Sequence, residues 1–273
     1  MQVETKRPNL RDLTGTFTPD VNKPKVENFW TPHRVELCQT IVEGINEELS
    51  PFGAPKVEFK PEQVEFLDKG VFDSELGRHA AKSGYISTSL EVAEIDQTLA
   101  AAYIHERLHD LSLRLAKRKG NEWAFRRAGL AMVRKPHISG GEASVLFVGL
   151  NDGVIHKTAQ KIYEHHLSSK YPNLRYQTQM SWEIGMVDAL CAIISSANQQ
   201  KYPAPKDVFR VFQKATFGKG QALELARLIE KTYGKDGFKK LGEQLGRLPM
   251  KGAFENGLPT KVADNMVVKG VRP

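Results

Sequence analysis

The chain has 273 residues, of which 40% are hydrophobic and 26% charged, a balance that is typical of a globular protein and excludes a disordered chain. Lysine and arginine number 39 against 32 acidic residues, so the formal net charge is +7. No apolar run approaches the roughly 18 residues that a membrane-spanning helix needs, so we expect no membrane partner.

The two cysteines, Cys38 and Cys191, are too few for a disulfide framework, and both have apolar neighbours. We interpret them as buried free thiols in a reducing compartment. Residues 1–11 lack the hydrophobic core of a signal peptide, so a cytoplasmic location is expected.

Basic residues gather in two stretches, Lys117–Lys135 and Lys201–Lys240, which could suggest a nucleic-acid surface. Neither stretch carries a zinc-knuckle, RNP or helix-turn-helix signature. We therefore interpret both as solvated basic faces and do not expect nucleic-acid binding.

The first half of the chain mixes helix and strand signals. Residues 1–30 lack periodicity and predict an extended arm. Thr31 as N-cap and Pro32 at the first helical position predict a helix that continues to Leu49. Alternating or β-branched residues then predict three short strands at 56–60, 63–68 and 84–89.

Apolar residues change to helical spacing at Asp96, which can cap a long helix ending near Lys119, just before Gly120. A short strand is predicted at 128–133, a loop at 136–141 and a second central helix over 145–167. The remaining helical signals cover 180–196, 205–216, 221–233 and a turn near 238–245, and 251–273 is predicted as an extended tail. Strands gathered early and helices late predict an α+β fold.

An HExxH motif at residues 105–109 lies on the predicted long helix. His105 and His109 are one helical turn apart, so both imidazoles can reach one Zn²⁺, while Glu106 can take a proton from the attacking water. Arg107 is expected to point to solvent, and Asp110 could accept an imidazole N–H. The competing interpretation is a helix that carries two ordinary histidines.

A second motif, Leu150-Asn151-Asp152-Gly153-Val154-Ile155-His156, follows on the next predicted helix. With HExxH it resembles the gluzincins, zincin metallopeptidases whose second helix carries LNEGxxE and supplies a glutamate as third zinc ligand. The resemblance extends loosely over residues 84–240. It implies a zincin-like fold with a small N-terminal sheet, an active-site helix and a mostly helical C-terminal lobe.

The resemblance implies a zinc metallopeptidase that hydrolyses a peptide or protein substrate, with Zn²⁺ held by His105, His109 and Asp152 and with Glu106 as general base. Asp152 stands where the family has glutamate, so His156 is an alternative ligand. Because these ligands fall on both sides of the midpoint, we expect one catalytic unit over 31–250, with lobes at 31–135 and 136–250. Candidate oxyanion donors are Tyr163, Tyr171, Tyr176 and His156.

Two other interpretations stay open at this level. The chain could be a catalytically weak or inactive zincin-fold interaction protein, because Arg107 and Asp152 depart from the family pattern. It could also be a basic protein associated with nucleic acid.

Overall fold

The computed structural model of the chain describes residues 29–67, 77–78, 86–89, 95–119, 122–134, 144–176, 181–218 and 222–246. The predicted arm, apart from Phe29 and Trp30, lies outside these residues, as do the predicted loop at 136–141 and the predicted tail at 251–273.

Helices make up most of the described residues, and seven short strands accompany them. The α-helices are α1 (Pro32–Leu49), α3 (Asp96–Leu111), α4 (Val148–Ile162), α5 (Ser181–Ala197), α6 (Pro205–Phe217), α7 (Ala222–Tyr233) and α8 (Gly237–Gly246). Shorter turns are η2 (Ser50–Phe52), η3 (Pro61–Gln63) and the π-helical η5 (Tyr163–Leu167). The strands are β1 (Val64–Leu67), β2 (Gly77–Arg78), β3 (Ile86–Ser89), β4 (Arg114–Lys119), β5 (Glu122–Ala128), β6 (Ala131–Arg134) and β7 (Ser144–Leu146). The predicted α+β class is confirmed.

Most helix predictions are confirmed, and local sequence explains why. The Thr31 side chain accepts the Arg34 N–H at 3.3 Å, which satisfies one free donor at the start of α1, and Pro32 occupies its first turn. The second central helix is present as α4 followed by η5, and α5 to α7 begin and end within two residues of the predicted bounds; the turn predicted near 238–245 is instead the ten-residue helix α8. Two of the predicted strands are present as β1 and β3, and the strand predicted at 128–133 is present, shifted to β6.

The long helix predicted to reach Lys119 ends at Leu111, so that prediction is wrong. The Ser112 hydroxyl donates to the His109 carbonyl at 2.7 Å, and its backbone N–H donates to the Leu108 carbonyl at 3.0 Å. These bonds satisfy carbonyls of the last turn, and the extended backbone of Ser112 directs the chain into β4.

The prediction of a strand at 56–60 is also wrong, because this segment has no regular structure. The Asn46 side chain takes the place of a partner strand at Val57: its amide donates to the Val57 carbonyl at 2.8 Å and its oxygen accepts the Val57 N–H at 2.9 Å. One side chain on α1 thus satisfies backbone groups that would otherwise need a sheet.

The described residues divide into two compact units, and the division passes through α4 between Lys157 and Thr158. The first unit holds the residues up to Ala124 together with 158–178, and the second holds 125–157 together with those from 179 onward. The predicted single catalytic unit over 31–250 stays a prediction.

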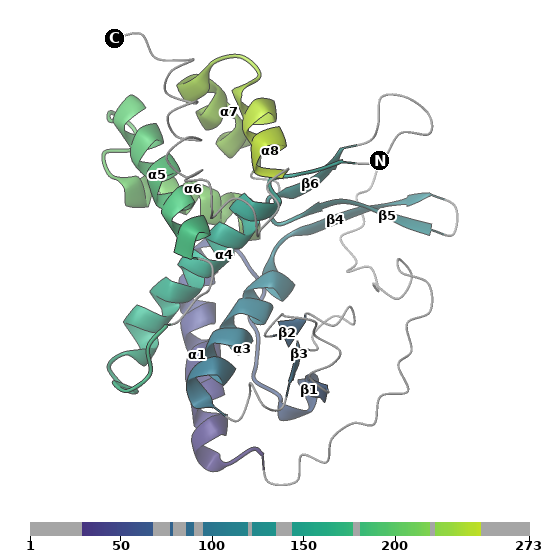
Figure 1. The fold of residues 1–273 in the computed structure, drawn as a ribbon, viewed down its shortest axis with the longest axis vertical. Helices are drawn as coiled ribbons and strands as arrows, with labels where there is room; N and C mark the ends of the chain where they lie inside the picture. The colour runs from purple at the N-terminus through teal and green to yellow at the C-terminus, as the bar shows by residue number, and fades with distance from the viewer. Residues whose placement is uncertain are drawn as a thin grey trace. The chain divides into compact units, whose positions relative to one another are not determined.

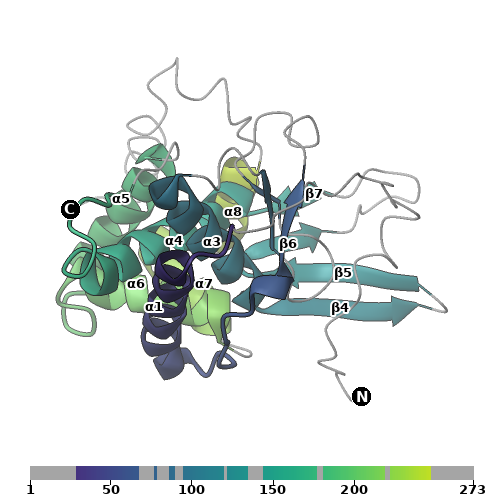
Figure 2. The ribbon, with the colours of Figure 1, turned by 90° about the horizontal axis from the view of Figure 1, so that it is seen from below.

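In the first unit, α1 and α3 lie side by side, and α3 also packs on β2 and β3 (Figures 1 and 2). The sheet has the order β1-β3-β2, with β1 parallel to β3 (Val64 opposite Ile86) and β2 antiparallel to β3 (Gly77 opposite Thr88). The facing helix surfaces are buried and apolar, with Leu37, Cys38, Ile41, Ile45 and Leu49 on α1 and Leu99, Tyr103, Ile104, Leu108 and Leu111 on α3.

In the second unit, consecutive helices from α5 to α8 pack on one another (Figure 1), and α8 also packs on β7. The second sheet has the order β4-β5-β6-β7; β4 and the start of β5 fall in the first unit, and β6 is antiparallel to both β5 and β7. The core joins the start of α4 to α5, α6 and α7, with Leu150, Val154, Val187, Phe212 and Ile229 among its fully buried side chains.

Both cysteines are free and buried, which confirms the prediction for their side chains. Among the helices that the structure describes, none is long and apolar enough to span a bilayer.

Candidate metal-binding site

The structure places His105 and His109 on the same face of α3, close to its C-terminal end. Their Nε2 atoms lie 3.0 Å apart and their ring centroids 4.5 Å apart. Both side chains are half-buried, and the Ser112 bonds that end α3 fix the turn on which His109 stands. The predicted pair of imidazoles is therefore brought together by the helix itself.

The spacing of this pair fits a shared metal ion. Zinc–nitrogen bonds of about 2.0–2.1 Å at a tetrahedral angle put two ligand nitrogens about 3.3 Å apart. The observed 3.0 Å is within a few tenths of an ångström of that separation. In this structure the two Nε2 atoms are at hydrogen-bond distance from each other, and the same arrangement would let both rings donate to one cation.

The other polar residues of the motif are buried, which corrects the prediction that Arg107 points to solvent. Arg107 is only 2% exposed; its guanidinium donates to Gln63 Oε1 at 3.1 Å and to the Tyr103 hydroxyl at 3.4 Å. Its Nη1 atom also lies 3.7 Å from Asp110 Oδ2. Arg107 is therefore a structural cation inside the first unit, and Asp110 balances its charge. Glu106 is buried as well, at 6% exposed.

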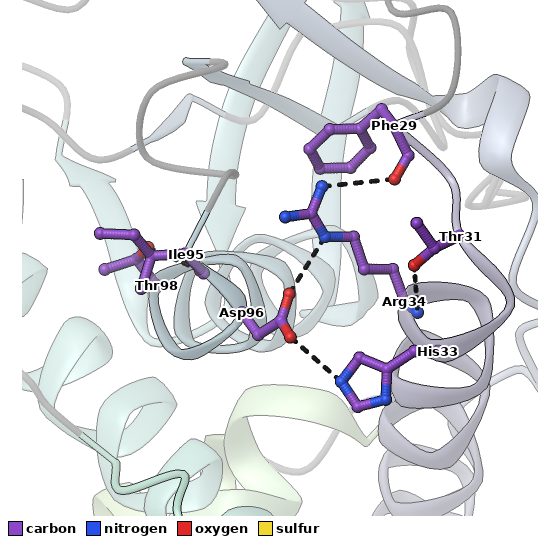
Figure 3. A network of polar contacts seen from close by, with 7 residues as sticks. All are labelled: Phe29, Thr31, His33, Arg34, Ile95, Asp96 and Thr98. Atoms are coloured by element: carbon purple, nitrogen blue, oxygen red, sulfur yellow. Dashed lines mark hydrogen bonds and ion pairs between the residues drawn. The ribbon is translucent and has the colours of Figure 1, made fainter.

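The beginning of α3 is tied to the beginning of α1 by a polar network (Figure 3). Asp96 is the first residue of α3 rather than its predicted N-cap; its Oδ1 accepts from Arg34 Nε and its Oδ2 contacts His33 Nε2, both at 3.0 Å. Arg34 also donates to the Phe29 carbonyl at 3.3 Å. A carboxylate at this end of α3 is favoured by the helix dipole. The network fixes where α3 begins, and with it the position of His105 and His109 along the helix.

Three residues of the second motif have structural roles in the second unit. Leu150 is fully buried in the core. Asn151 Oδ1 accepts the Leu130 N–H at 2.8 Å, which attaches α4 to the hairpin turn between β5 and β6. Gly153 lies against α5, where a Cβ atom would come within 2.7 Å of the Glu183 carbonyl oxygen. Packing and anchoring explain these residues without any ligand.

Asp152 and His156 remain as the chemical groups of this motif, one turn apart on α4. Burial raises the pKa of Asp152 to about 6, against a smaller opposing effect of its hydrogen bond with Asn151. Burial also lowers the pKa of His156 to about 4, which favours the neutral imidazole that a metal requires. Both residues belong to the second unit, whereas His105 and His109 belong to the first. Within the described part of the chain, no three His, Cys, Asp or Glu side chains gather closely enough to hold a metal ion.

The candidate oxyanion donors are placed differently by the structure. The Tyr171 ring lies 5.7 Å from the His33 ring, and His33 contacts Asp96, so Tyr171 stands at the start of α3. His105 is nine residues further along, or about 13 Å along the helix axis. Tyr163 and Tyr176 lie together with ring centroids 5.8 Å apart. This distance along α3 argues against Tyr171 as an oxyanion donor next to His105, and the other candidate donors stay predictions.

Two buried charged residues of the second unit were not found from the sequence. Arg127, part of the first basic stretch, is 6% exposed and donates to the backbone carbonyls of Gly129 and Ala215. Glu183, in the first turn of α5, is completely buried. For Glu183, the sequence signal that could have indicated its burial is an acidic residue among apolar positions of a predicted helix.

Comparison with known proteins gives no match to this chain. No family model matches, and neither the curated proteins nor the solved structures include a significant match. The likeness to gluzincins therefore depends on the two short motifs alone.

Proposed function

We propose that the chain is a zinc-dependent peptidase of the zincin type, acting on peptide or protein substrates in the cytoplasm. The observation that supports the proposal best is the 3.0 Å separation of the His105 and His109 Nε2 atoms on one face of α3. A zincin-like arrangement of strands and active-site helix is part of the same proposal, and the packing of α3 on β2 and β3 is consistent with it.

Each residue has a defined role in this proposal. His105 and His109 would hold the zinc ion, and the sequence motif assigns the third ligand to Asp152. Glu106 follows His105 directly, takes a proton from the attacking water and delivers it to the leaving amine. Zinc bound there would act as a Lewis acid toward the substrate carbonyl.

The proposal is tested with Glu106→Gln in the full chain, assayed on casein and on a mixed quenched-peptide library. The variant should keep its zinc and lose about 10²–10⁴-fold of the hydrolytic rate, because Gln cannot accept the proton. Glu230→Gln, an exposed position on α7, is the matched control and should hydrolyse at the wild-type rate.

Hydrolysis by Glu106→Gln at the wild-type rate would remove Glu106 from the mechanism. A wild-type chain that binds zinc but cleaves none of these substrates would favour the inactive zincin-fold interaction protein instead.

A further inference from the structure

A small cavity lies inside the first unit, where the chain leaves the C-terminal end of α1, and its volume is about 110 Å³. The buried side chains of Ile45 and Leu49 on α1 and of Leu111 at the end of α3 form an apolar floor. On the other side the cavity is lined by Ser50 and Lys56. Both of these residues are exposed, so the cavity opens to solvent between them.

The segment that forms the solvent side of the cavity, residues 50–56, is held in place by hydrogen bonds at both ends. The Asn46 side chain bonds both the N–H and the carbonyl of Val57, at 2.9 and 2.8 Å. The Gly53 N–H donates to the Ser50 carbonyl at 3.0 Å and closes the turn that follows α1. The cavity is therefore formed before any ligand binds, which lowers the entropic cost of binding.

The solvent side of the cavity carries two hydrogen-bond donors whose side chains are not engaged by the rest of the described chain. Lys56 forms no ion pair with the residues that the structure describes, and within the same residues the Ser50 hydroxyl makes no hydrogen bond. None of the described side chains that line the cavity is acidic. An ammonium and a hydroxyl beside an apolar floor favour a ligand that combines a carboxylate with a hydrocarbon part.

The volume of the cavity limits the size of that hydrocarbon part. An apolar cavity of about 150 Å³ in a protein core holds benzene. The smaller volume here, 110 Å³, fits a branched tail of roughly four or five carbons. A long fatty acid or a folded peptide segment exceeds this space, so a small free molecule is the occupant that fits.

We propose that this cavity binds a small free carboxylic acid with a branched hydrocarbon tail. The carboxylate lies next to Lys56 and Ser50, and the tail packs on the apolar floor. Because Leu111 belongs to the last turn of α3, the bound acid contacts the turn that carries His109. The proposal stands independently of the proposed function, since it needs neither zinc nor hydrolysis.

The test titrates the full chain with isovalerate, a short branched acid, and follows the leucine methyl signals by NMR. Saturable binding with a Kd of about a millimolar is expected for a ligand of this size. Isovaleramide has the same tail without the charge and should bind about threefold more weakly.

Variants of the cavity locate the binding. Lys56→Met keeps a long apolar side chain and should weaken isovalerate binding by about threefold to fivefold, because the charge is lost at an exposed position. Lys60→Met removes an exposed lysine that does not line the cavity and should bind isovalerate as the wild type does. Ala54→Leu places a larger side chain in the cavity lining and should abolish binding.

The proposal is overturned if the wild-type chain shows no saturable binding of isovalerate, or if Ala54→Leu binds it undiminished. Equal affinities of the wild type and Lys56→Met would also overturn it, and this comparison holds even where Ala54→Leu does not fold. Tighter binding of an acetylated tripeptide ending in leucine would show that the cavity takes a peptide carboxyl end instead of a free acid. None of these outcomes bears on zinc binding, so they leave the proposed function untouched.

Discussion

The side-chain oxygen of Asn151 occupies the space that a Cβ atom at Gly129 would need. The same oxygen accepts the Leu130 N–H at 2.8 Å, so the turn between β5 and β6 is attached to α4 one residue before Asp152. Gly129 has a φ of +57°, a left-handed conformation that favours glycine. The pair explains why the LNDG motif needs an asparagine and why a glycine stands 22 residues earlier in the chain.

Gly129→Ala should therefore lower the free energy of unfolding by about 3 kcal/mol, because it adds left-handed strain and breaks a buried hydrogen bond. Urea unfolding followed by circular dichroism measures the change. Gly53→Ala is the control, since Gly53 has a φ of +71° but nothing within 4 Å of a Cβ atom, and it should cost only about 1 kcal/mol. Equal losses in the two variants would show that the contact with Asn151 contributes nothing.

Asp96→Asn should destabilise the first unit by about 1 kcal/mol, because it weakens the bonds to Arg34 and His33 and removes a favourable charge from the start of α3 (Figure 3). Glu58→Gln, which removes an exposed partner of Lys60 at 3.8 Å, should have almost no effect. Thermal unfolding of both variants measures the difference. A loss no larger in Asp96→Asn than in Glu58→Gln would contradict the structural role of the network.

The two cysteines should be unreactive in the folded chain. Burial raises the pKa of both thiols to about 12, so the reactive thiolate is scarce, and neither sulfur is accessible. An aromatic disulfide reagent at pH 8 should titrate neither Cys38 nor Cys191 until guanidinium is added, and then both. Rapid reaction of one thiol per native chain would show that one of the two helices opens readily.

The helices could be predicted from the sequence because their signals are local. Thr31 and Pro32 define the start of α1, and apolar spacing defines the helices from α5 to α8. The end of α3 could not be predicted from apolar spacing, because Leu115 continues the helical spacing beyond it. The helix ends where Ser112 hydrogen-bonds to the last turn, and the spacing of apolar residues does not indicate such bonds. Gly120-Asn121, between the ends of β4 and β5, is a dipeptide typical of hairpins and was the available signal.

In the candidate site too, the sequence predicts what one helix determines and does not predict contacts between distant residues. The i, i+4 spacing was sufficient to bring His105 and His109 together, because a single helix sets that geometry. The burial of Arg107 involves Gln63, 44 residues earlier, and the close approach of the Glu183 backbone to α4 requires the glycine at position 153. Contacts of this kind join residues that are far apart in the sequence, so a short motif does not predict them.

The central claim is that His105 and His109 bind a zinc ion, and the zinc content of the purified full chain tests it most directly. Elemental analysis after dialysis against metal-free buffer should give about one zinc per wild-type chain. His109→Ala should retain almost none, and His165→Ala, an exposed histidine of η5, should retain the wild-type amount. A wild-type chain without zinc, or a His109→Ala variant that keeps it, would contradict the account.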